Sequence, residues 1–248
     1  IGARLRQLHR TGRPAIYPRG STHSRRKRTN AQGIGGNSLT KVIFIRHGQT
    51  EWNVTGRYQG QSDVQLSEEG RQQAMKLAEN FPVEKVDAIY ASDLQRAMVT
   101  AETIAQKFGL KVQAEPAFRE LSFGDWEGLT YQQIVDKWEE AMANFLQHPD
   151  ILEIPGGESF PAVQKRATKR LGELLPKHDG QTIVVVAHGA VLRTMLTAAL
   201  HMPLQYLWSI RQFNTAVNIV RYDSDANPTV ELLNSTAHLG NEVQRGII

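Results

Sequence analysis

Two short apolar runs of the chain each lead into a histidine–glycine pair, the first of them through Arg46. His47 and the glycine after it follow residues 42–45, and His188 and its glycine follow residues 183–187. Runs of this kind, rich in β-branched residues, predict strands that are buried on both faces of a sheet. Ligands of open α/β sheets bind beyond the carboxyl ends of the strands, where helix N-termini offer free N–H groups and a partial positive charge. We therefore expect both imidazoles to face one crevice that suits an anion.

Four segments around these histidines form an ordered set. They are RHGQTEWNVTGRYQG at 46–60, SDLQRAMVTAETI at 92–104, RELSFGDWEG at 119–128 and VAHGAVLR at 186–193. With these segments the chain resembles the histidine phosphatase superfamily, in particular the branch of small phosphatases and cofactor-dependent phosphoglycerate mutases. The acid-bearing third segment is most similar to that of broad-specificity and α-ribazole phosphatases. The resemblance covers residues 41–240.

The resemblance implies a role for the polar residues of these segments. His47 is expected to be the nucleophile that becomes phosphohistidine, and His188 to grip the phosphoryl oxygens. The other expected phosphate or substrate contacts are Arg46, Asn53, Arg57, Arg96 and Gly189. The chemistry agrees, because guanidinium groups supply permanent positive charge and planar pairs of donors to a phosphate without a metal. For attack, His47 must present an unprotonated nitrogen, so its other nitrogen should donate to an acceptor such as a backbone carbonyl.

The expelled alkoxide needs a proton, and the resemblance implies that Glu120 supplies it and later activates water as a base. A structural ion pair between Glu120 and Arg119 is the alternative interpretation.

Trp126 could line the pocket or fill the core. Glu158 suits the N-terminus of a helix electrostatically and is not expected to be catalytic.

The secondary-structure elements that must position these residues can be predicted from the pattern of apolar and polar residues along the chain. From residue 41 on, short apolar runs alternate with longer amphipathic segments, which is typical of α/β proteins. We predict a three-layer α/β/α fold with a mainly parallel central sheet and a helical cap. Strands are predicted at 42–45, 88–91, 111–114, 183–187, 215–222 and 229–234, the last two as an antiparallel hairpin at the sheet edge. Helices are predicted from an N-cap at Ser67 to residue 80, from an N-cap at Asp93 to residue 108, over the cap segment 130–148, and over 190–200.

The basic residues are concentrated at the start of the chain. Residues 1–40 hold nine of the 29 Lys and Arg residues and no acid, so residues 41–248 carry 20 basic against 25 acidic residues, a formal charge of −5. The irregular Gly, Pro, Ser and Arg composition of residues 1–40 predicts that they form a disordered leader. One domain is predicted over 41–240 and a flexible tail over 241–248. The leader could be vector-derived, a native tail or a transit peptide.

Several functional classes are excluded or disfavoured. Without cysteine the chain has no disulfide framework and no thiolate nucleophile. There is no membrane-length apolar run, no secretory h-region, and no HExxH motif or Asp-rich run for a metal, so we expect a cytoplasmic, metal-independent and cofactor-free enzyme. Its expected partner is a small phosphorylated metabolite, whereas nucleic acid binding through the basic cluster 25–28 is disfavoured.

A phosphatase that works through a phosphohistidine is the favoured function, and phosphoglycerate mutase is the alternative. A mutase must shield its phosphohistidine from water, which takes a longer cap and tail than this chain offers.

Overall fold

The computed structural model describes residues 39–240. Apart from its last two residues, the predicted disordered leader lies outside this range, and so does the predicted tail at 241–248. The first strand begins at Thr40, one residue before the predicted start of the domain. Within the described residues, no helix has both the length and the apolar character that a membrane span requires.

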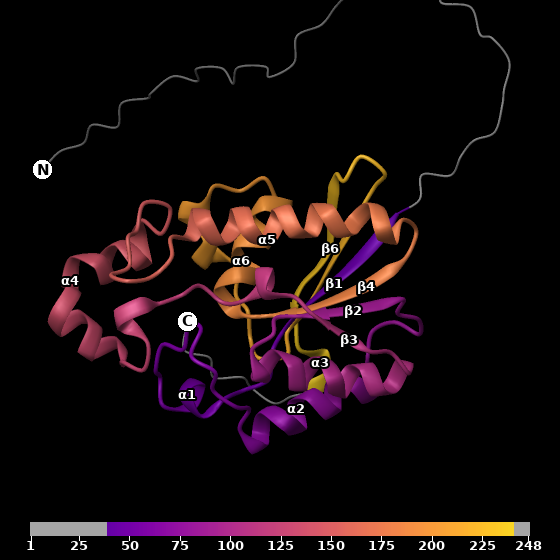
Figure 1. The fold of residues 1–248 in the computed structure, drawn as a ribbon, viewed down its shortest axis with the longest axis horizontal. Helices are drawn as coiled ribbons and strands as arrows, with labels where there is room; N and C mark the ends of the chain where they lie inside the picture. Colours follow the sequence, from indigo (N-terminus) through magenta and orange to yellow (C-terminus); the bar gives the residue numbers. More distant parts are fainter. Residues whose placement is uncertain (1–38, 241–248) are drawn as a thin grey trace, which may run out of the picture. The chain divides into compact units, whose positions relative to one another are not determined.

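A mixed six-stranded sheet forms the centre of the molecule (Figure 1). Its strands are β1 (Thr40–Arg46), β2 (Ala88–Ala91), β3 (Val112–Ala114), β4 (Thr182–Ala187), β5 (Val217–Tyr222) and β6 (Pro228–Ser235), in the order β3-β2-β4-β1-β5-β6. The first four are parallel, whereas β5 runs antiparallel to β1 and β6 antiparallel to β5. The predicted mainly parallel sheet with an antiparallel hairpin at its edge is therefore confirmed.

Helices cover both faces of the sheet and complete the three predicted layers (Figure 1). On one face lie α2 (Glu68–Glu79) and α3 (Gln95–Phe108), and on the other lie α5 (Phe160–Leu174) and α6 (Gly189–Ala199). Alternate residues of β1 enter the two cores: Val42 and Phe44 pack toward α5 and α6, and Ile43 and Ile45 toward α2 and α3. A strand that is buried on both faces needs such a continuous apolar run.

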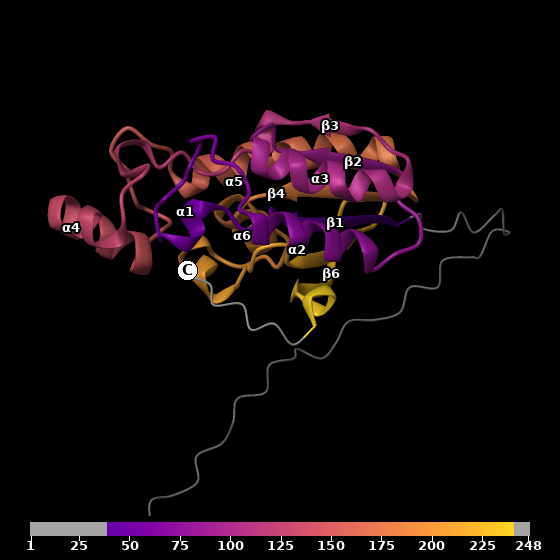
Figure 2. The ribbon, with the colours of Figure 1, turned by 90° about the horizontal axis from the view of Figure 1, so that it is seen from below.

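The remaining helices gather mainly at one end of the sheet. The kinked helix α4 (Tyr131–Gln147) and the short α1 (Glu51–Val54) project beyond the strands in both views (Figures 1 and 2). The predicted helical cap corresponds to α4, which begins at a Thr130 capping box and bends at Trp138. The 3-10 helices are η1 (Pro116–Phe118), η2 (Gly124–Trp126), η3 (Leu175–His178), η4 (Leu204–Ser209) and η5 (Ala237–Leu239).

One predicted helix start is wrong. Ser67 caps α2 as predicted, with its side chain accepting from Gly70 N, but Asp93 does not cap α3. The N-cap position belongs to Leu94, which makes no side-chain capping bond. Asp93 instead accepts a hydrogen bond of 2.7 Å from Nε of Arg119, because a charge-assisted bond to guanidinium is stronger than a neutral capping bond.

Candidate active site

The two histidines meet at the carboxyl ends of neighbouring parallel strands. Arg46 and Ala187 are register partners in β1 and β4, so the next residue of each strand leaves the sheet at the same level. The ring centroids of His47 and His188 are 5.1 Å apart, and both residues are buried. The two imidazoles are therefore neighbours, as expected, but of the two only His47 lines the adjoining cavity.

The imidazole of His47 is held in one orientation. Its Nδ1 lies 2.6 Å from the carbonyl oxygen of Gly48, and since a carbonyl can only accept, Nδ1 carries the proton and Nε2 keeps its lone pair. Gly48 is required here because a Cβ on it would lie 2.4 Å from the backbone oxygen of Gly70. The amide of Gly48 also donates to Thr100 Oγ1 at 3.1 Å, which ties the turn to α3.

Both rings are held in the neutral form. Burial is the largest cause that lowers the pKa of His47 well below its ordinary value, and the charges of Arg96 and Arg46 lower it further. The hydrogen bond to Gly48 opposes this effect in part. Burial and the same two arginines also lower the pKa of His188. A neutral His47 can act as a nucleophile near neutral pH.

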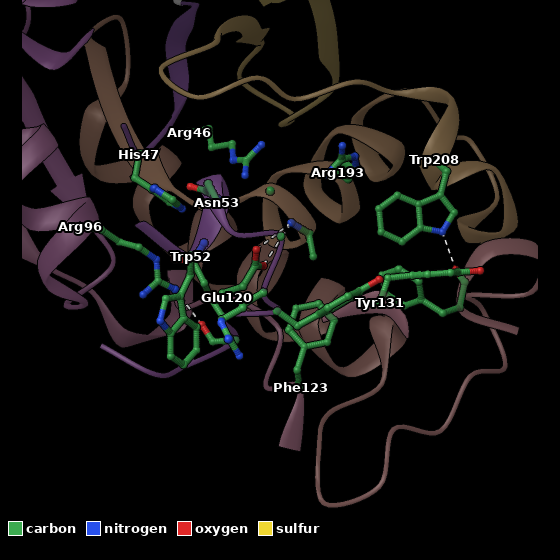
Figure 3. Close-up of a pocket in the computed structure, with 18 residues that line it drawn as sticks. Arg46, His47, Trp52, Asn53, Arg96, Glu120, Phe123, Tyr131, Arg193 and Trp208 are labelled. Carbon is green, nitrogen blue, oxygen red and sulfur yellow. Dashed lines mark hydrogen bonds between the residues drawn. The ribbon is translucent and has the colours of Figure 1, made fainter. Parts of the chain in front are cut away.

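Two buried guanidiniums, those of Arg46 and Arg96, lie on either side of His47 (Figure 3). Arg46 donates from Nη1 to Gln212 O at 2.5 Å, and Arg96 donates to Ser62 O at 2.8 Å and Gly60 O at 2.7 Å. The Nε atoms of both arginines have no hydrogen-bond partner within residues 39–240. Burial lowers the pKa of Arg96 to about 10, which leaves it protonated at neutral pH. Fixed charges with unused donors are suited to an oxyanion.

Glu120 lies at the N-terminus of α6, in the wall of the same site (Figure 3). Its Oε1 accepts from Ala190 N at 3.1 Å and Val191 N at 3.0 Å, and Ala190 N also lies 3.1 Å from Oε2. The alternative that Glu120 serves as the ion partner of Arg119 is wrong, because Arg119 pairs with Asp93. The carboxyl group thus lies beside the anion site and not on the surface.

The site opens into a cavity of about 170 Å³. Seven of the eight residues expected from the sequence line it: Arg46, His47, Asn53, Arg57, Arg96, Glu120 and Gly189. His188 lies behind the cavity wall, and neither of its ring nitrogens has a hydrogen-bond partner among the described residues. The cavity is smaller than the pockets of drug-sized ligands, which suits a small metabolite.

Asn53 and Arg57, the two further expected phosphate or substrate contacts, differ in how their side chains are held. Asn53 uses its side-chain oxygen to accept from Thr50 N at 3.0 Å in a capping box and from Asn214 Nδ2 at 3.3 Å. Asn214 Nδ2 also donates to His47 O at 3.1 Å, so this amide pair braces the turn that carries the histidine. Arg57 is exposed at the cavity rim and donates from Nη1 to Gly128 O at 2.5 Å.

Trp126 and Glu158 have structural surroundings. Trp126 is fully buried and does not line the cavity, so it fills the core. Glu158 precedes the first turn of α5 and pairs with Arg166 at 3.0 Å. Arg166 in turn donates to the backbone oxygen of Glu120 at 2.9 Å, which fixes the segment that carries this carboxyl group.

The sequence interpretation missed several cavity residues. Arg193 lies four residues after Gly189 and therefore on the same face of α6, a helical spacing that could have revealed it. The aromatic part of the wall comes from segments without a local signal: Trp52, Tyr58, Phe123, Tyr131, Phe145 and Trp208. Within the described range, no group of three or more His, Asp or Glu side chains is arranged to hold a metal ion.

Comparison with known proteins agrees with this site. The family model of the histidine phosphatase superfamily (branch 1) matches residues 42–236. The chain belongs to this superfamily. As a histidine phosphatase it is similar to phosphoserine phosphatase 1 of Hydrogenobacter thermophilus, with 36% identity over 82% of this chain and 95% of that protein. It is also 35% identical to the metal-independent phosphoserine phosphatase of Arabidopsis thaliana, over 84% of this chain and 87% of the relative.

A solved structure gives the same result. A mutant phosphoserine phosphatase from Entamoeba histolytica in complex with phosphoserine superimposes with a TM-score of 0.73 and 32% identity, over 81% of this chain and 99% of that one. Phosphoglycerate mutase-like proteins are also among the relatives. The phosphatase relatives favour the phosphatase function over the mutase alternative. This histidine phosphatase is a phosphoric monoester hydrolase.

Proposed function

We propose that the chain hydrolyses small phosphomonoesters in two steps, with His47 as the nucleophile. One observation carries the proposal: His47 and His188 lie together under two buried guanidiniums, and Nδ1 of His47 is committed to a carbonyl. In the first step the lone pair of Nε2 forms a bond to phosphorus while the bond to the ester oxygen breaks. In the second, water attacks phosphorus, the N–P bond breaks and inorganic phosphate leaves.

The anion-binding groups act mainly on the transition state. Arg46 and Arg96 each hold an unused Nε–H in the buried site. The amide of Gly189, the first residue of α6, lies at a helix N-terminus that favours negative charge. With His188 these donors hold the nonbridging oxygens as charge redistributes, and each such fixed donor accelerates the reaction by about 10²–10³-fold.

Glu120 is proposed to transfer a proton in each of the two steps. As an acid it gives its proton to the departing ester oxygen, and as a base it takes one from the water that attacks phosphohistidine. The support is its place: a buried carboxyl group in the cavity wall, next to Gly189 and held by backbone N–H groups of α6.

The proposed substrate is a phosphorylated hydroxy amino acid or hydroxy acid of the size of phosphoserine. The support comes from the small cavity and from relatives whose names specify phosphoserine. A cytoplasmic location, a reaction without metal or cofactor, and the absence of nucleic acid partners remain proposals from the sequence.

The test is phosphate release from phosphoserine and p-nitrophenyl phosphate in the presence of EDTA. We expect turnover of both esters to survive chelation. A parallel incubation with 3-phosphoglycerate and its bisphosphate primer tests the mutase alternative. Isomerised phosphoglycerate with little free phosphate would reject the proposed hydrolysis.

A further inference from the structure

A third buried guanidinium lies on the far side of the cavity from the nucleophile. Arg193 is 5% exposed and donates from Nε to Ile210 O at 2.8 Å. Its guanidinium carbon lies 5.1 Å from the ring centroid of Trp208. Figure 3 shows it between Arg46 and Trp208, with His47 and Arg96 on the opposite side. The backbone bond and the indole together fix where this charge points.

The charge of Arg193 has no partner of its own. Within residues 39–240 no carboxylate forms an ion pair with it, and its two terminal nitrogens make no hydrogen bond. Glu120 is the one acidic residue in the described cavity lining, where it faces the guanidiniums of Arg46, Arg96 and Arg193. Burial lowers the pKa of Arg193 to about 9, so the group is still charged at neutral pH. An uncompensated buried cation is costly, and a bound anion would relieve that cost.

Arg193 adjoins the phosphoryl site at Gly189 and lies within reach of the same small molecule. A Cβ added to Gly189 would lie 3.1 Å from Nη1 of Arg193 and 3.6 Å from the guanidinium carbon of Arg46. The two guanidiniums therefore flank the same point of α6. Arg193 lies on the Trp208 side of Arg46, away from His47 (Figure 3), so it can reach a part of the ligand other than the phosphorus.

We propose that Arg193 binds a carboxylate of the substrate, placed a few bonds from the ester oxygen, and so selects phosphorylated hydroxy acids and hydroxy amino acids. This inference rests on the proposed function of the same cavity. Free terminal nitrogens on a planar guanidinium fit a carboxylate in a bidentate arrangement. Aromatic side chains, Trp208 among them, line this part of the cavity, and such apolar surroundings strengthen an ion pair.

The first test needs only the wild-type enzyme. O-Phosphoserine and O-phosphoethanolamine differ by the carboxylate alone, and we expect kcat/KM to be about 10- to 100-fold higher for phosphoserine, as for a hydrogen bond to a charged group. A ratio near one would overturn the carboxylate site. If p-nitrophenyl phosphate is hydrolysed while the ratio is near one, the proposed function stands and only this inference fails. If no phosphomonoester is hydrolysed, both fail.

The second test assigns the preference to Arg193. Arg193→Met and Arg193→Gln should bring the ratio toward one, mainly through a higher KM for phosphoserine, and Arg193→Lys should restore part of it. The matched control is Arg71→Met, because Arg71 is exposed on α2 and outside the cavity lining, and it should keep the wild-type ratio. An unchanged ratio in a folded Met or Gln variant would remove Arg193 from substrate recognition. If neither variant folds, the wild-type ratio decides.

Discussion

The two histidine–glycine pairs have the same dipeptide at the end of adjacent strands, yet the protein holds them differently. His47 has Nδ1 tied to the carbonyl of its own glycine, and that glycine is pressed against the backbone of α2. His188 has no partner for either ring nitrogen in the described part of the chain, and its glycine begins α6 beneath two guanidiniums. The first pair is therefore built to present one lone pair. The second is built to leave donors available for an anion.

The largest expected effect comes from removing the imidazole of His47, with His188 as its comparison. His47→Asn should lower kcat with p-nitrophenyl phosphate by about 10⁴-fold or more, because the proposed covalent intermediate forms on its Nε2. His188→Asn should cost about 10²–10³-fold, the effect of losing one fixed donor. Rapid quench with radiolabelled substrate should find acid-labile phosphate in the His188 variant only. Labelled protein in the His47 variant would contradict the division of roles.

The acid next to the second pair gives the next largest effect. Glu120→Gln should slow hydrolysis of alkyl phosphates by about 10²–10⁴-fold, because their poor leaving group needs a proton. The effect on p-nitrophenyl phosphate should be much smaller, since nitrophenolate leaves unprotonated. Steady-state kinetics with both esters measures the difference. Equal losses for the two substrates would argue against Glu120 as the acid.

The two glycines should respond differently to the same substitution. Gly48→Ala places a Cβ 2.4 Å from a backbone oxygen that cannot easily move, so we expect about 1–3 kcal/mol less free energy of unfolding. Gly189→Ala places a Cβ 3.1 Å from Nη1 of Arg193 and 3.6 Å from the guanidinium carbon of Arg46, a crowding that a small displacement of the side-chain ends relieves, so stability should change little while KM rises. Urea denaturation and phosphatase kinetics on both variants test this. A destabilised Gly189→Ala with normal KM would reverse the comparison.

The smallest expected effect is on the pH dependence of stability. The folded-state pKa values of His47 and His188 are lowered by burial and by the nearby arginines. Below about pH 6.5 the unfolded chain therefore binds protons that the folded chain does not, and the free energy of unfolding decreases as the pH is lowered. Each ring should account for about 1.4 kcal/mol of the loss between pH 7.5 and 5.5. Urea denaturation of His47→Asn and His188→Asn in phosphate-free buffer should show a smaller loss than the wild type. A wild-type slope in either variant would mean that its ring is protonated when folded.

The sequence predicted all six strands of the described sheet because their signals are local. The apolar runs at 42–45 and 183–187 are buried on both faces as expected. The two strands pair in parallel, with Val42 opposite Ile183. The N-cap of α3 could not be predicted, because Asp93 is taken up by a guanidinium 26 residues further along the chain. A capping preference is weak enough for such a long-range ion pair to override it.

The site was predictable to the extent that its residues belong to motifs with a recognisable order. His47, Arg46 and Arg96 lie in such motifs and do face one cavity. The surroundings of Arg193 were not predictable, since they depend on Trp208 and Ile210, which come from a separate 3-10 segment and the residue after it. The position of His188 behind the cavity wall likewise depends on packing that no single segment encodes.

The reversed direction of β5 has a consequence for biosynthesis. Because β5 is antiparallel to β1, the residues that precede it arrive at the catalytic end of the sheet, where Gln212 O accepts from Arg46 and Asn214 Nδ2 donates to His47 O. A nascent chain on the ribosome exposes the nucleophile early but receives these braces only after nearly the whole domain has emerged. Chains released before residue 212 therefore lack both of these hydrogen bonds.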